Sequence, residues 1–396
     1  MSKFSTSVIG GAGRIGLPFS IVNALAERKT IVFDTNKELV ELIKQGKIPY
    51  KENGLEAALK NALASGYLQF GDDPIKMQFS DVIVLTIGTP VDPYLKPDCS
   101  SIIEALRPYF PYLNNKHLIV RSTVYPGGIK DIKYNLKKNG IEVSISYAPE
   151  RALQGDTLQE MKRTPQLVSS EDELSLKYCS DFFADISPSI VELQPEEAEL
   201  VKLFTNAYRY THFAIVNQFL QMATDLKCDY KRIESAMRVG YPRLADMPPS
   251  GFTAGPCLRK DTLLLASSYP EFTMGKSAFW INENLPNFIV SKLDAAYQLN
   301  YKTVGILGLA FKAENDDTRD SLALRLRKLL KVKAKKVLCH DPYVQNEDTV
   351  GLQEILEECD IAILATPHDC YRSLSKVAGP KIIDVWNFLE RRVGLV

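Results

Sequence analysis

The sequence lacks several features that mark common functional classes. Its 396 residues carry 48 Lys plus Arg against 48 Asp plus Glu, so it has none of the basic excess that nucleic-acid binding needs. Its longest apolar stretches, such as residues 81–88, are far shorter than the roughly 18 residues of a membrane-spanning helix. We therefore expect no nucleic-acid partner and no association with a membrane.

Signals for export and for metal binding are also missing. The first residues, MSKFSTSVIGG, lead directly into a strand pattern, without the charged leader and cleavage site of a secretory signal. The seven cysteines lie between Cys99 and Cys370, and no two have the close spacing of a zinc or redox motif. We expect a cytoplasmic protein without a metal ion, whose cysteines other than Cys257 are buried and inert.

Two segments at opposite ends of the chain repeat one strand plan. The first contains TSVIGGAGRIG, IVFDTN and SDVIVLTIGTP; the second contains KTVGILGLAF, KKVLCHDPY and CDIAILATPH. Apolar strands that alternate with helices are typical of parallel sheets covered on both faces. At about 150 residues per domain the length allows two to three domains, so we expect one α/β domain at each end.

A long helix is predicted between these segments. Pro195 suits its first turn, Glu196 and Glu197 suit its positive end, and the next thirty or so residues contain neither Gly nor Pro. Apolar residues occur nearly all round it, which favours burial between domains or between subunits. We therefore expect a homodimer or a higher homo-oligomer.

The glycine-rich segment GAGRIG predicts a dinucleotide site. Gly11, Gly13 and Gly16 follow a strand and precede a helix, where such glycines allow a tight turn, close approach to a pyrophosphate and helix packing. Asp34 ends the next strand, where a carboxylate binds a ribose diol and favours NAD. The alternative is a glycine-rich turn without a ligand, but the strand, helix and acid together favour NAD.

The second α/β segment has no such triplet. It retains only Gly305 and Gly308, so it should bind something else or nothing. Lys312 and Arg319 follow its first strand, at the sheet end where ligands bind, and would hold phosphates there. The alternative is a solvated charged loop. The predicted fold is α/β, with two Rossmann-like, doubly wound parallel-sheet domains (residues 1–194 and 299–396) joined by a central helical region (residues 195–298).

Cys257 is the candidate nucleophile. A loop rich in Gly and Pro, SGFTAGPC, precedes it and a helical pattern comes after it, so the thiol should lie at a helix N-terminus. Backbone N–H groups and the nearby Lys260 would favour the thiolate. Asp261 is four residues further on, on the same helix face.

Polar residues elsewhere in the chain have two interpretations each. Lys202 and Asn206 lie one turn apart on the long helix, although Glu199 and Lys202 would also form an ordinary surface pair. Thr123 and Glu150 end two further strands of the first sheet and would lie beside a nicotinamide. Alternatively, Thr123 caps a turn and Glu150 is solvated.

The order of these motifs resembles the UDP-glucose/GDP-mannose dehydrogenase family of nucleotide-sugar 6-dehydrogenases. The motifs are GAGRIG, IGTP, STVYPGG, APER, EAELVKLFTNAYR, GFTAGPCLRKD, GLAFKAENDDTRDS and HDPY, and they span nearly the whole chain. The resemblance implies a four-electron oxidation of a sugar C6 hydroxyl to a carboxylate, with two NAD used in turn. Cys257 would carry a thiohemiacetal and then a thioester.

The resemblance also implies roles for individual residues. As catalytic residues it implies Cys257, Lys202, Asn206, Asp261, Thr123 and Glu150. For NAD binding it implies Gly11, Gly13, Arg14, Ile15, Gly16, Asp34, Thr89, Thr123 and Arg319. For binding of the nucleotide-sugar substrate it implies Glu150, Lys202, Asn206, Arg243, Phe252, Gly255, Phe311 and Lys312. In the family, the arginine that Arg243 resembles reaches the substrate of a neighbouring subunit.

Departures from the family pattern limit the substrate assignment. Family members commonly have proline where this chain has Arg259, a cation that would depress the thiol pKa or alter substrate choice. The loop MPPSGFTAG differs from the glucose-type version, which favours an N-acetylated UDP-hexosamine. Two other functions stay open: a two-electron dehydrogenase resembling the 6-phosphogluconate type, and a catalytically silent nucleotide-binding relative.

Overall fold

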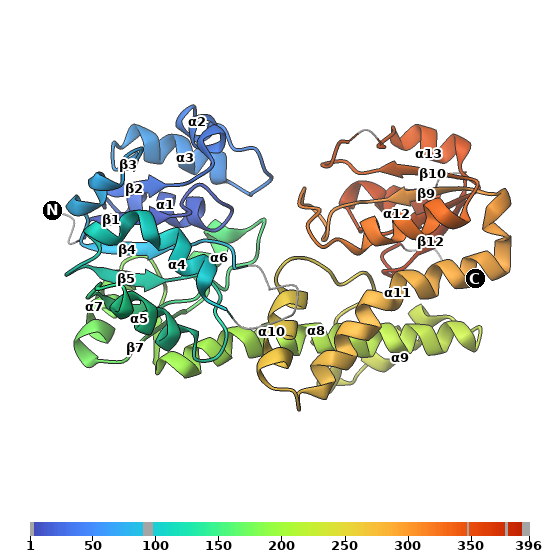
Figure 1. Ribbon diagram of the computed structural model, residues 1–396. Coiled ribbons are helices and arrows are strands. Elements are labelled where there is room, and N and C mark those ends of the chain that lie inside the picture. The colour runs from blue at the N-terminus through green and yellow to red at the C-terminus, as the bar shows by residue number, and fades with distance from the viewer. Residues whose placement is uncertain (1–3, 90–97, 347, 377–378, 390–396) are drawn as a thin grey trace. The chain divides into compact units, whose positions relative to one another are not determined.

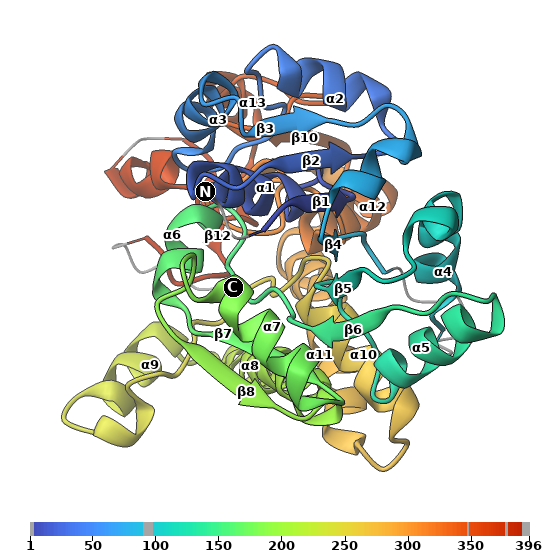
Figure 2. The same cartoon turned by 90° about the vertical axis from the view of Figure 1, so that its left-hand side faces the viewer.

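The computed structural model describes residues 4–89, 98–346, 348–376 and 379–389. The chain divides into two compact units, Met1–Thr205 and Asn206–Val396, which we call the first and second unit and describe separately. Figures 1 and 2 show that each unit is built around a sheet covered by helices. The prediction of an α/β fold with two doubly wound domains is confirmed.

The first unit contains an eight-stranded sheet with the order β3-β2-β1-β4-β5-β6-β7-β8. The strands are β1 (Thr6–Ile9), β2 (Thr30–Phe33), β3 (Leu68–Phe70), β4 (Val82–Leu85), β5 (His117–Val120), β6 (Ser144–Tyr147), β7 (Gln166–Ser170) and β8 (Ile190–Leu193). The order of the first six strands is that of a Rossmann sheet. Adjacent strands from β3 to β6 are parallel, so the carboxyl ends of these six strands share one edge.

Helices cover both faces of this sheet because successive strand residues alternate between two cores. Val8 and Val84 pack on one face, whereas Ile9 and Leu85 pack on the other. The helices are α1 (Gly16–Leu25), α2 (Lys37–Lys44), α3 (Leu55–Ala64), α4 (Ser100–Leu106), α5 (Gly128–Lys138), α6 (Thr157–Arg163) and α7 (Glu173–Phe183). Short 3₁₀ turns are found at η1 (Pro74–Phe79) and η2 (Arg107–Tyr112).

One part of the sheet differs from the all-parallel expectation. Strand β7 pairs with β6 in the antiparallel direction, through Ser146 with Ser170 and Tyr147 with Ser169, and β8 is parallel to β7. An antiparallel addition at the edge of a parallel sheet is a common arrangement. The all-parallel prediction is therefore wrong at this edge, because strand patterns by themselves do not carry direction.

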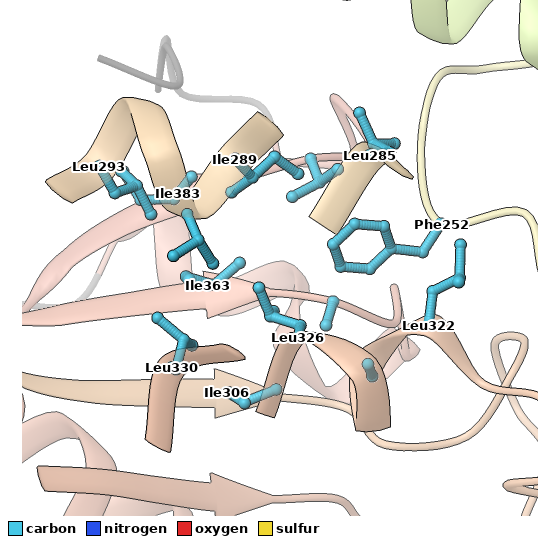
Figure 3. Packing of buried hydrophobic residues seen from close by; sticks show 14 of the residues in the cluster. Phe252, Leu285, Ile289, Leu293, Ile306, Leu322, Leu326, Leu330, Ile363 and Ile383 are labelled. Atoms are coloured by element: carbon cyan, nitrogen blue, oxygen red, sulfur yellow. The ribbon is translucent and has the colours of Figure 1, made fainter. Parts of the chain in front are cut away.

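The second unit contains a parallel four-stranded sheet with the order β10-β9-β11-β12. The strands are β9 (Thr303–Leu307), β10 (Lys336–His340), β11 (Ile361–Leu364) and β12 (Lys381–Asp384). The helices are α9 (Tyr230–Arg238), α10 (Leu258–Ser268), α11 (Thr273–Tyr297), α12 (Leu322–Lys333) and α13 (Leu352–Glu358), with 3₁₀ turns η3 (Pro242–Leu244), η4 (Leu299–Tyr301) and η5 (Asp369–Lys376). Its main core packs α11 and α12 on the sheet, as Figure 3 shows for Leu285, Ile289, Leu326 and Ile363.

The predicted central helix is present as α8 (Pro195–Asp225), a single helix of 31 residues that begins at the predicted proline. It is not buried all round in the single chain. Large apolar side chains at Phe204, Tyr208, Phe219 and Met222 are exposed. Among the residues that the structure describes, no helix is both long and apolar enough to cross a membrane.

Candidate active site

The loop after β1 forms the first part of the site. Gly10, rather than Gly11, adopts the positive φ, at +76°, which L side chains rarely tolerate. A Cβ on Gly16 would lie 2.2 Å from the Gly10 carbonyl oxygen, so only glycine lets α1 begin this close beneath the loop. A Cβ on Gly13 would meet only that same oxygen, at 3.5 Å, so the backbone at Gly13 borders open space.

The N-terminus of α1 can accept an anion. Ile15 is its N-cap and provides no side-chain hydrogen bond, and the first turn of the helix has no acidic residue. Backbone N–H groups at such an end attract phosphate. Arg14 lies beside this turn, with its guanidinium 4.7 Å from the centre of the Tyr50 ring. These features fit the diphosphate of a dinucleotide.

Asp34 directly follows β2 and is bound to the same loop. Its Oδ2 accepts a hydrogen bond from Ala12 N at 3.1 Å and its Oδ1 accepts one from Asn36 N at 3.0 Å. The residue is only partly buried, so the carboxylate can also accept hydrogen bonds from a ligand. This is the position expected for a ribose-binding acid.

Thr89, Thr123 and Glu150 lie at the carboxyl edge of the sheet, each a few residues after the end of a strand. The Thr89 hydroxyl donates to the carbonyl oxygen of Thr123 at 2.8 Å. Glu150 forms an ion pair with the buried Arg121 and accepts hydrogen bonds from the N–H groups of Arg151 and Ala152. Its side chain is only 10% exposed, so the alternative of a solvated Glu150 is wrong.

The surroundings of Glu150 determine its charge. Burial by itself favours the neutral acid, but the Arg121 charge and the two backbone donors outweigh it and hold the pKa of Glu150 below its usual value. Glu150 is therefore a carboxylate at neutral pH. It can accept a proton or orient a water molecule, but it does not start as an acid.

Glu199 does not form the surface pair with Lys202 that was one interpretation of the long helix. It is fully buried and accepts hydrogen bonds from Gly127 N and Ile129 N, at 2.6 and 2.8 Å, at the start of α5. Burial raises its pKa to about 6 despite these donors. About seventy residues of sequence separate Glu199 from the N–H groups it accepts, so no local pattern indicates this contact.

In the second unit, Cys257 is the N-cap residue of α10 and is exposed. The predicted placement of this thiol at a helix N-terminus is confirmed. Gly255 before it has a φ of +103°, and a Cβ there would lie 2.5 Å from the Phe311 ring. The tight approach of these two residues fixes the entry of the chain into α10.

Asp261 lies one turn beyond Cys257 and is bound to Asn206. Its N–H donates to the Cys257 carbonyl oxygen at 2.9 Å, and its Oδ2 accepts a hydrogen bond from Asn206 Nδ2 at 2.6 Å. Lys260 lies 3.6 Å from the other carboxylate oxygen. Asp261 is almost completely buried, so these contacts hold its carboxyl group at the base of the turn that carries the thiol.

The loop after β9 provides a further charged group near Cys257. Arg319 pairs with Asp317, with a closest approach of 2.6 Å. Hydrogen bonding to Asp317 is the main reason that the pKa of Arg319 is raised, and the Cys257 charge acts in the same direction. The N–H of Phe311 donates to the Asp317 carbonyl oxygen, which places Phe311 and Lys312 at the carboxyl end of β9.

Two predicted substrate residues lie apart from this cluster. Phe252 is only 2% exposed, and its side chain packs against Leu285 and Leu322 in the core (Figure 3). Arg243 is exposed on η3, 5.3 Å from the Tyr241 ring.

Two cysteines that were expected to be buried reach the surface. Cys228 and Cys370 are exposed, whereas Cys99, Cys179, Cys339 and Cys359 are buried as predicted. None of the seven, all of which lie in the described parts of the chain, forms a disulfide bond. Polar neighbours in the sequence gave no clear signal of which cysteines reach the surface, because that depends on packing between elements.

The predicted catalytic residues are divided between the units. Thr123, Glu150 and Lys202 belong to the first unit; Asn206, Cys257 and Asp261 belong to the second. Lys202 precedes Asn206 by one turn of α8. In the described parts of the chain, no group of three or more His, Cys, Asp or Glu residues could hold a metal ion.

The glycine loop, the uncapped helix N-terminus and Asp34 define a dinucleotide-binding class of protein. Three family models match: the UDP-glucose/GDP-mannose dehydrogenase family NAD binding domain at residues 5–187, its central domain at 196–283 and its UDP binding domain at 305–391. The chain therefore belongs to the UDP-glucose/GDP-mannose dehydrogenase family. It is an NAD-dependent nucleotide-sugar dehydrogenase.

Individual relatives agree over the full length. The chain is 28% identical to the UDP-N-acetyl-D-mannosamine dehydrogenase of Methanocaldococcus jannaschii, over 99% of this chain and 96% of the relative. The solved UDP-D-ManNAc dehydrogenase of Pyrococcus horikoshii is 26% identical with a TM-score of 0.89, covering 98% and 97% of the two chains. A UDP-glucose dehydrogenase structure from Pyrobaculum islandicum has the same identity and TM-score, covering 100% and 98%.

Proposed function

We propose that this enzyme oxidises the C6 hydroxyl of a UDP-N-acetylhexosamine to the carboxylate in two successive NAD-dependent steps, with Cys257 as the nucleophile. The observation that carries the proposal is the exposed Cys257 thiol at the N-terminus of α10, one turn from the hydrogen-bonded pair Asp261 and Asn206. A helix N-terminus favours the thiolate, which is the reactive form. A simple two-electron dehydrogenase needs no such group.

The cysteine accounts for the second oxidation. The first removes a hydride from C6 and a proton from its hydroxyl, which leaves an aldehyde. The Cys257 thiolate adds to this aldehyde to form a thiohemiacetal, and loss of a second hydride and a proton leaves a thioester. Water then cleaves the thioester, which releases the carboxylate and restores the thiol. NAD, when bound, would supply the hydride acceptor for each oxidation.

The polar residues have complementary roles in this scheme. Lys202 and Asn206 stabilise the alkoxide and the oxyanions that develop at C6. Asp261 holds Asn206 and takes part in proton transfer together with Thr123. Glu150 is ionised, as its lowered pKa requires, and orients or deprotonates the hydrolytic water.

The cofactor is held by the first unit, where the loop fits a diphosphate. The residues that would hold it are Gly11, Gly13, Arg14, Ile15, Gly16, Asp34, Thr89 and Thr123. Arg319 of the second unit is proposed to reach the cofactor diphosphate. The open backbone at Gly13 and the uncapped start of α1 support this assignment.

The nucleotide of the substrate is assigned to the second unit. Phe311 and Lys312 at the carboxyl end of β9 would hold it, and the backbone at Phe252 and Gly255 would line the sugar site. Arg243 is exposed, as its proposed contact with the substrate of a neighbouring subunit requires. The proposed functional division is residues 1–194 for NAD, 195–298 for dimerisation and the nucleophile, and 299–396 for the UDP moiety.

The identity of the sugar rests on two observations. The loop MPPSGFTAG differs from the glucose type, and the relatives from M. jannaschii and P. horikoshii bear names specifying UDP-N-acetyl-D-mannosamine. The similarity to a UDP-glucose dehydrogenase supports the same chemistry on an unacetylated hexose. Substrate assays must therefore include both classes.

Assembly into a homodimer is proposed through α8. Its exposed apolar residues occur at helical spacing along one stripe: Phe204, Tyr208, Ile215, Phe219 and Met222. Exposed apolar stripes of this kind are typical of interfaces. We also propose a cytoplasmic location, since seven cysteines that form no disulfide suit a reducing compartment.

The stoichiometry of NADH tests the mechanism. Purified enzyme with excess NAD and limiting UDP-GlcNAc, UDP-ManNAc, UDP-GalNAc, UDP-glucose or GDP-mannose should release two NADH per sugar consumed with its true substrate. One NADH per sugar would support the two-electron alternative. Binding without any NADH would support the silent relative.

Replacing the nucleophile gives the largest expected effect on activity. Cys257→Ser should lower the rate of acid formation by about a thousandfold or more, because a serine hydroxyl is a much weaker nucleophile than a thiolate. Mass spectrometry of the products measures the outcome, and Cys228→Ser, which changes another exposed thiol, is the control. Acid formation at the wild-type rate in Cys257→Ser would contradict the mechanism.

A further inference from the structure

Arg259 lies two residues after Cys257, in the first turn of α10, and its side chain reaches two other elements. Its guanidinium is 3.4 Å from Glu283 on α11 and 3.3 Å from Asp320 in the loop between β9 and α12. It also lies 5.4 Å from the centre of the Phe279 ring on α11. A single side chain thus joins the turn that carries the thiol to two separate parts of the second unit.

Glu283 is the more buried of the two carboxylates that face this arginine. It is nearly buried on α11 and is paired on its other side with Arg325 of α12, at 3.2 Å. Burial raises the pKa of Glu283, and the two arginines oppose that shift. A carboxylate in this position is stabilised by the guanidinium groups on either side, and breaking a buried pair leaves a charge uncompensated.

Asp320 holds the chain on both sides of Cys257. Its side chain pairs with Arg259, and its backbone carbonyl oxygen accepts a hydrogen bond from Gly255 N at 3.5 Å. Asp320 also directly follows Arg319, which interacts with the Cys257 charge. The residues before and after the thiol are therefore tied to one loop position.

We propose that Arg259 is a positioning residue that clamps the first turn of α10 to Glu283 and Asp320 and so holds Cys257 at the helix N-terminus. The inference rests on the proposed function, in which Cys257 is the nucleophile. Because two carboxylates bind the guanidinium, it acts through the placement of the turn rather than as an unpaired cation beside the thiol. Where the family commonly has a rigid proline, this chain has an ion-pair clamp instead.

Alkylation of Cys257 by iodoacetamide tests the clamp without turnover. Peptide mass spectrometry measures each thiol separately, and the exposed Cys228 in the same molecule is an internal reference. Arg259→Met should slow alkylation of Cys257 about fivefold, since a frayed first turn no longer favours the thiolate. The rate at Cys228 should not change.

Arg325→Met is the matched control. It removes the other arginine from Glu283 but leaves both ion pairs of Arg259 in place. It should change the alkylation rate of Cys257 by less than about 1.5-fold, while its effect on thermal unfolding resembles that of Arg259→Met. Equal slowing of alkylation in the two variants would overturn the clamp in favour of general destabilisation.

Glu283→Gln separates positioning from charge. Removing a negative charge would favour the thiolate and speed alkylation if only electrostatics acted, whereas loss of the anchor should slow alkylation about threefold. Arg259→Lys should restore part of the rate, because an ammonium group can reach one carboxylate but lacks the guanidinium fork. Faster alkylation in Glu283→Gln would overturn the proposal.

Steady-state kinetics connect the clamp with catalysis. Arg259→Met should lower kcat for acid formation about tenfold and leave the KM for NAD unchanged. If Cys257→Ser retains wild-type acid formation, the proposed function fails, and the alkylation ratios still decide whether the clamp exists. If Cys257→Ser is inactive, but Arg259→Met is alkylated at Cys257 and forms acid at the wild-type rates, only the clamp is overturned.

Discussion

The loop after β1 in the first unit closely resembles the loop after β9 in the second unit. The backbone N–H groups of the two loops are hydrogen-bonded in the same way. Gly10 and Gly308 both have positive φ, and their N–H groups donate to the last residues of the neighbouring strands, Phe33 and His340. In each unit the aspartate directly after that neighbouring strand, Asp34 or Asp341, accepts N–H groups from the loop. The sequence repeat therefore extends to individual hydrogen bonds.

The segments that come after these two loops differ between the units. The first loop passes directly into α1 at Gly16, and the N-cap Ile15 makes no side-chain bond to the helix. The second continues through a charged loop to α12, whose N-cap Ser321 accepts a hydrogen bond from Ala323 N. One helix N-terminus is thus left for an anion and the other is satisfied by its own chain, which supports placing the proposed dinucleotide site in the first unit.

Asp34 and Asp341 also differ in how accessible they are to a ligand. Asp34 is partly exposed, whereas Asp341 is buried and bonded to the fully buried His368 at 3.2 Å. His368 accepts a hydrogen bond from Glu314 N at its Nδ1, so the hydrogen on its Nε2 is directed to Asp341. Asp341 is therefore part of the framework, while Asp34 remains available to a ligand.

The largest effect on stability is expected for Asp341→Asn. An amide oxygen cannot accept all the N–H groups that the two carboxylate oxygens accept, and each unsatisfied buried group costs about 1–3 kcal/mol. We expect the free energy of unfolding to fall by about 3 kcal/mol for Asp341→Asn and by less than about 1 kcal/mol for the more exposed Asp34→Asn. Urea unfolding followed by far-ultraviolet circular dichroism measures both losses, because both units contain helices. Equal losses would show that the two acids are equivalent.

The pH dependence of stability should have opposite signs for the buried acids of the two units. The pKa of Glu199 is raised to about 6 by burial, so the folded state binds its proton more tightly than the unfolded state. Its contribution should be complete below about pH 4.5 and should decrease by about 2 kcal/mol as the pH rises past 6.

The pKa of Asp341 is instead held below its usual value. Burial opposes this, but hydrogen bonding from His368 and from the backbone outweighs burial. Its contribution should therefore be present at neutral pH and be lost as the pH falls below about 4. Denaturation curves of Glu199→Gln and Asp341→Asn between about pH 2.5 and pH 8, each relative to wild type, measure both slopes. Slopes of the same sign would contradict the assignment.

The cofactor assignment predicts a selective kinetic effect in the first unit. Asp34→Ala should raise the KM for NAD about tenfold, because it removes the acceptor for the ribose hydroxyls, and should leave the KM for the sugar nucleotide unchanged. Initial rates at varied concentrations of each substrate measure the two constants. A change confined to the sugar nucleotide would mean that the roles of the two units are exchanged.

The smallest effect is expected at Gly13. A Cβ there has room within the chain, so Gly13→Ala should fold with unchanged stability and yet raise the KM for NAD about threefold by crowding the diphosphate. Gly351→Ala, whose Cβ would meet nothing within 4 Å at the start of α13, is the control. No difference between the two variants would remove Gly13 from the cofactor site.

Much of the fold results from local patterns in the sequence. Apolar strands that end in Gly, Asp or Thr predict the two sheets, and Pro195 marks the observed start of α8. The placement of Cys257 at a helix N-terminus was also predictable, because a Gly and Pro loop precedes a helical pattern. These features depend on residues close in the sequence, and backbone preferences act over that range.

Long-range contacts were not predictable in the same way. Glu199 caps α5 some seventy residues earlier in the chain, and Phe252 packs in a core formed with α11 and α12. The reversed β7 and the exposure of Cys228 have the same origin. The type of a residue indicates whether it needs a polar or an apolar partner. It does not indicate which segment of the chain provides that partner.

The sequence by itself determined the repeated α/β plan, the glycine loop with Asp34, and the cysteine at the start of a helix, since each depends on local backbone geometry. Only the tertiary structure decided that Asp341 is buried against His368, that Glu150 is paired with Arg121, and that Arg259 bridges Glu283 and Asp320. Those outcomes depend on burial. A charge that is removed from water is stable only when it is paired with a specific partner, and the fold decides which residue that partner is.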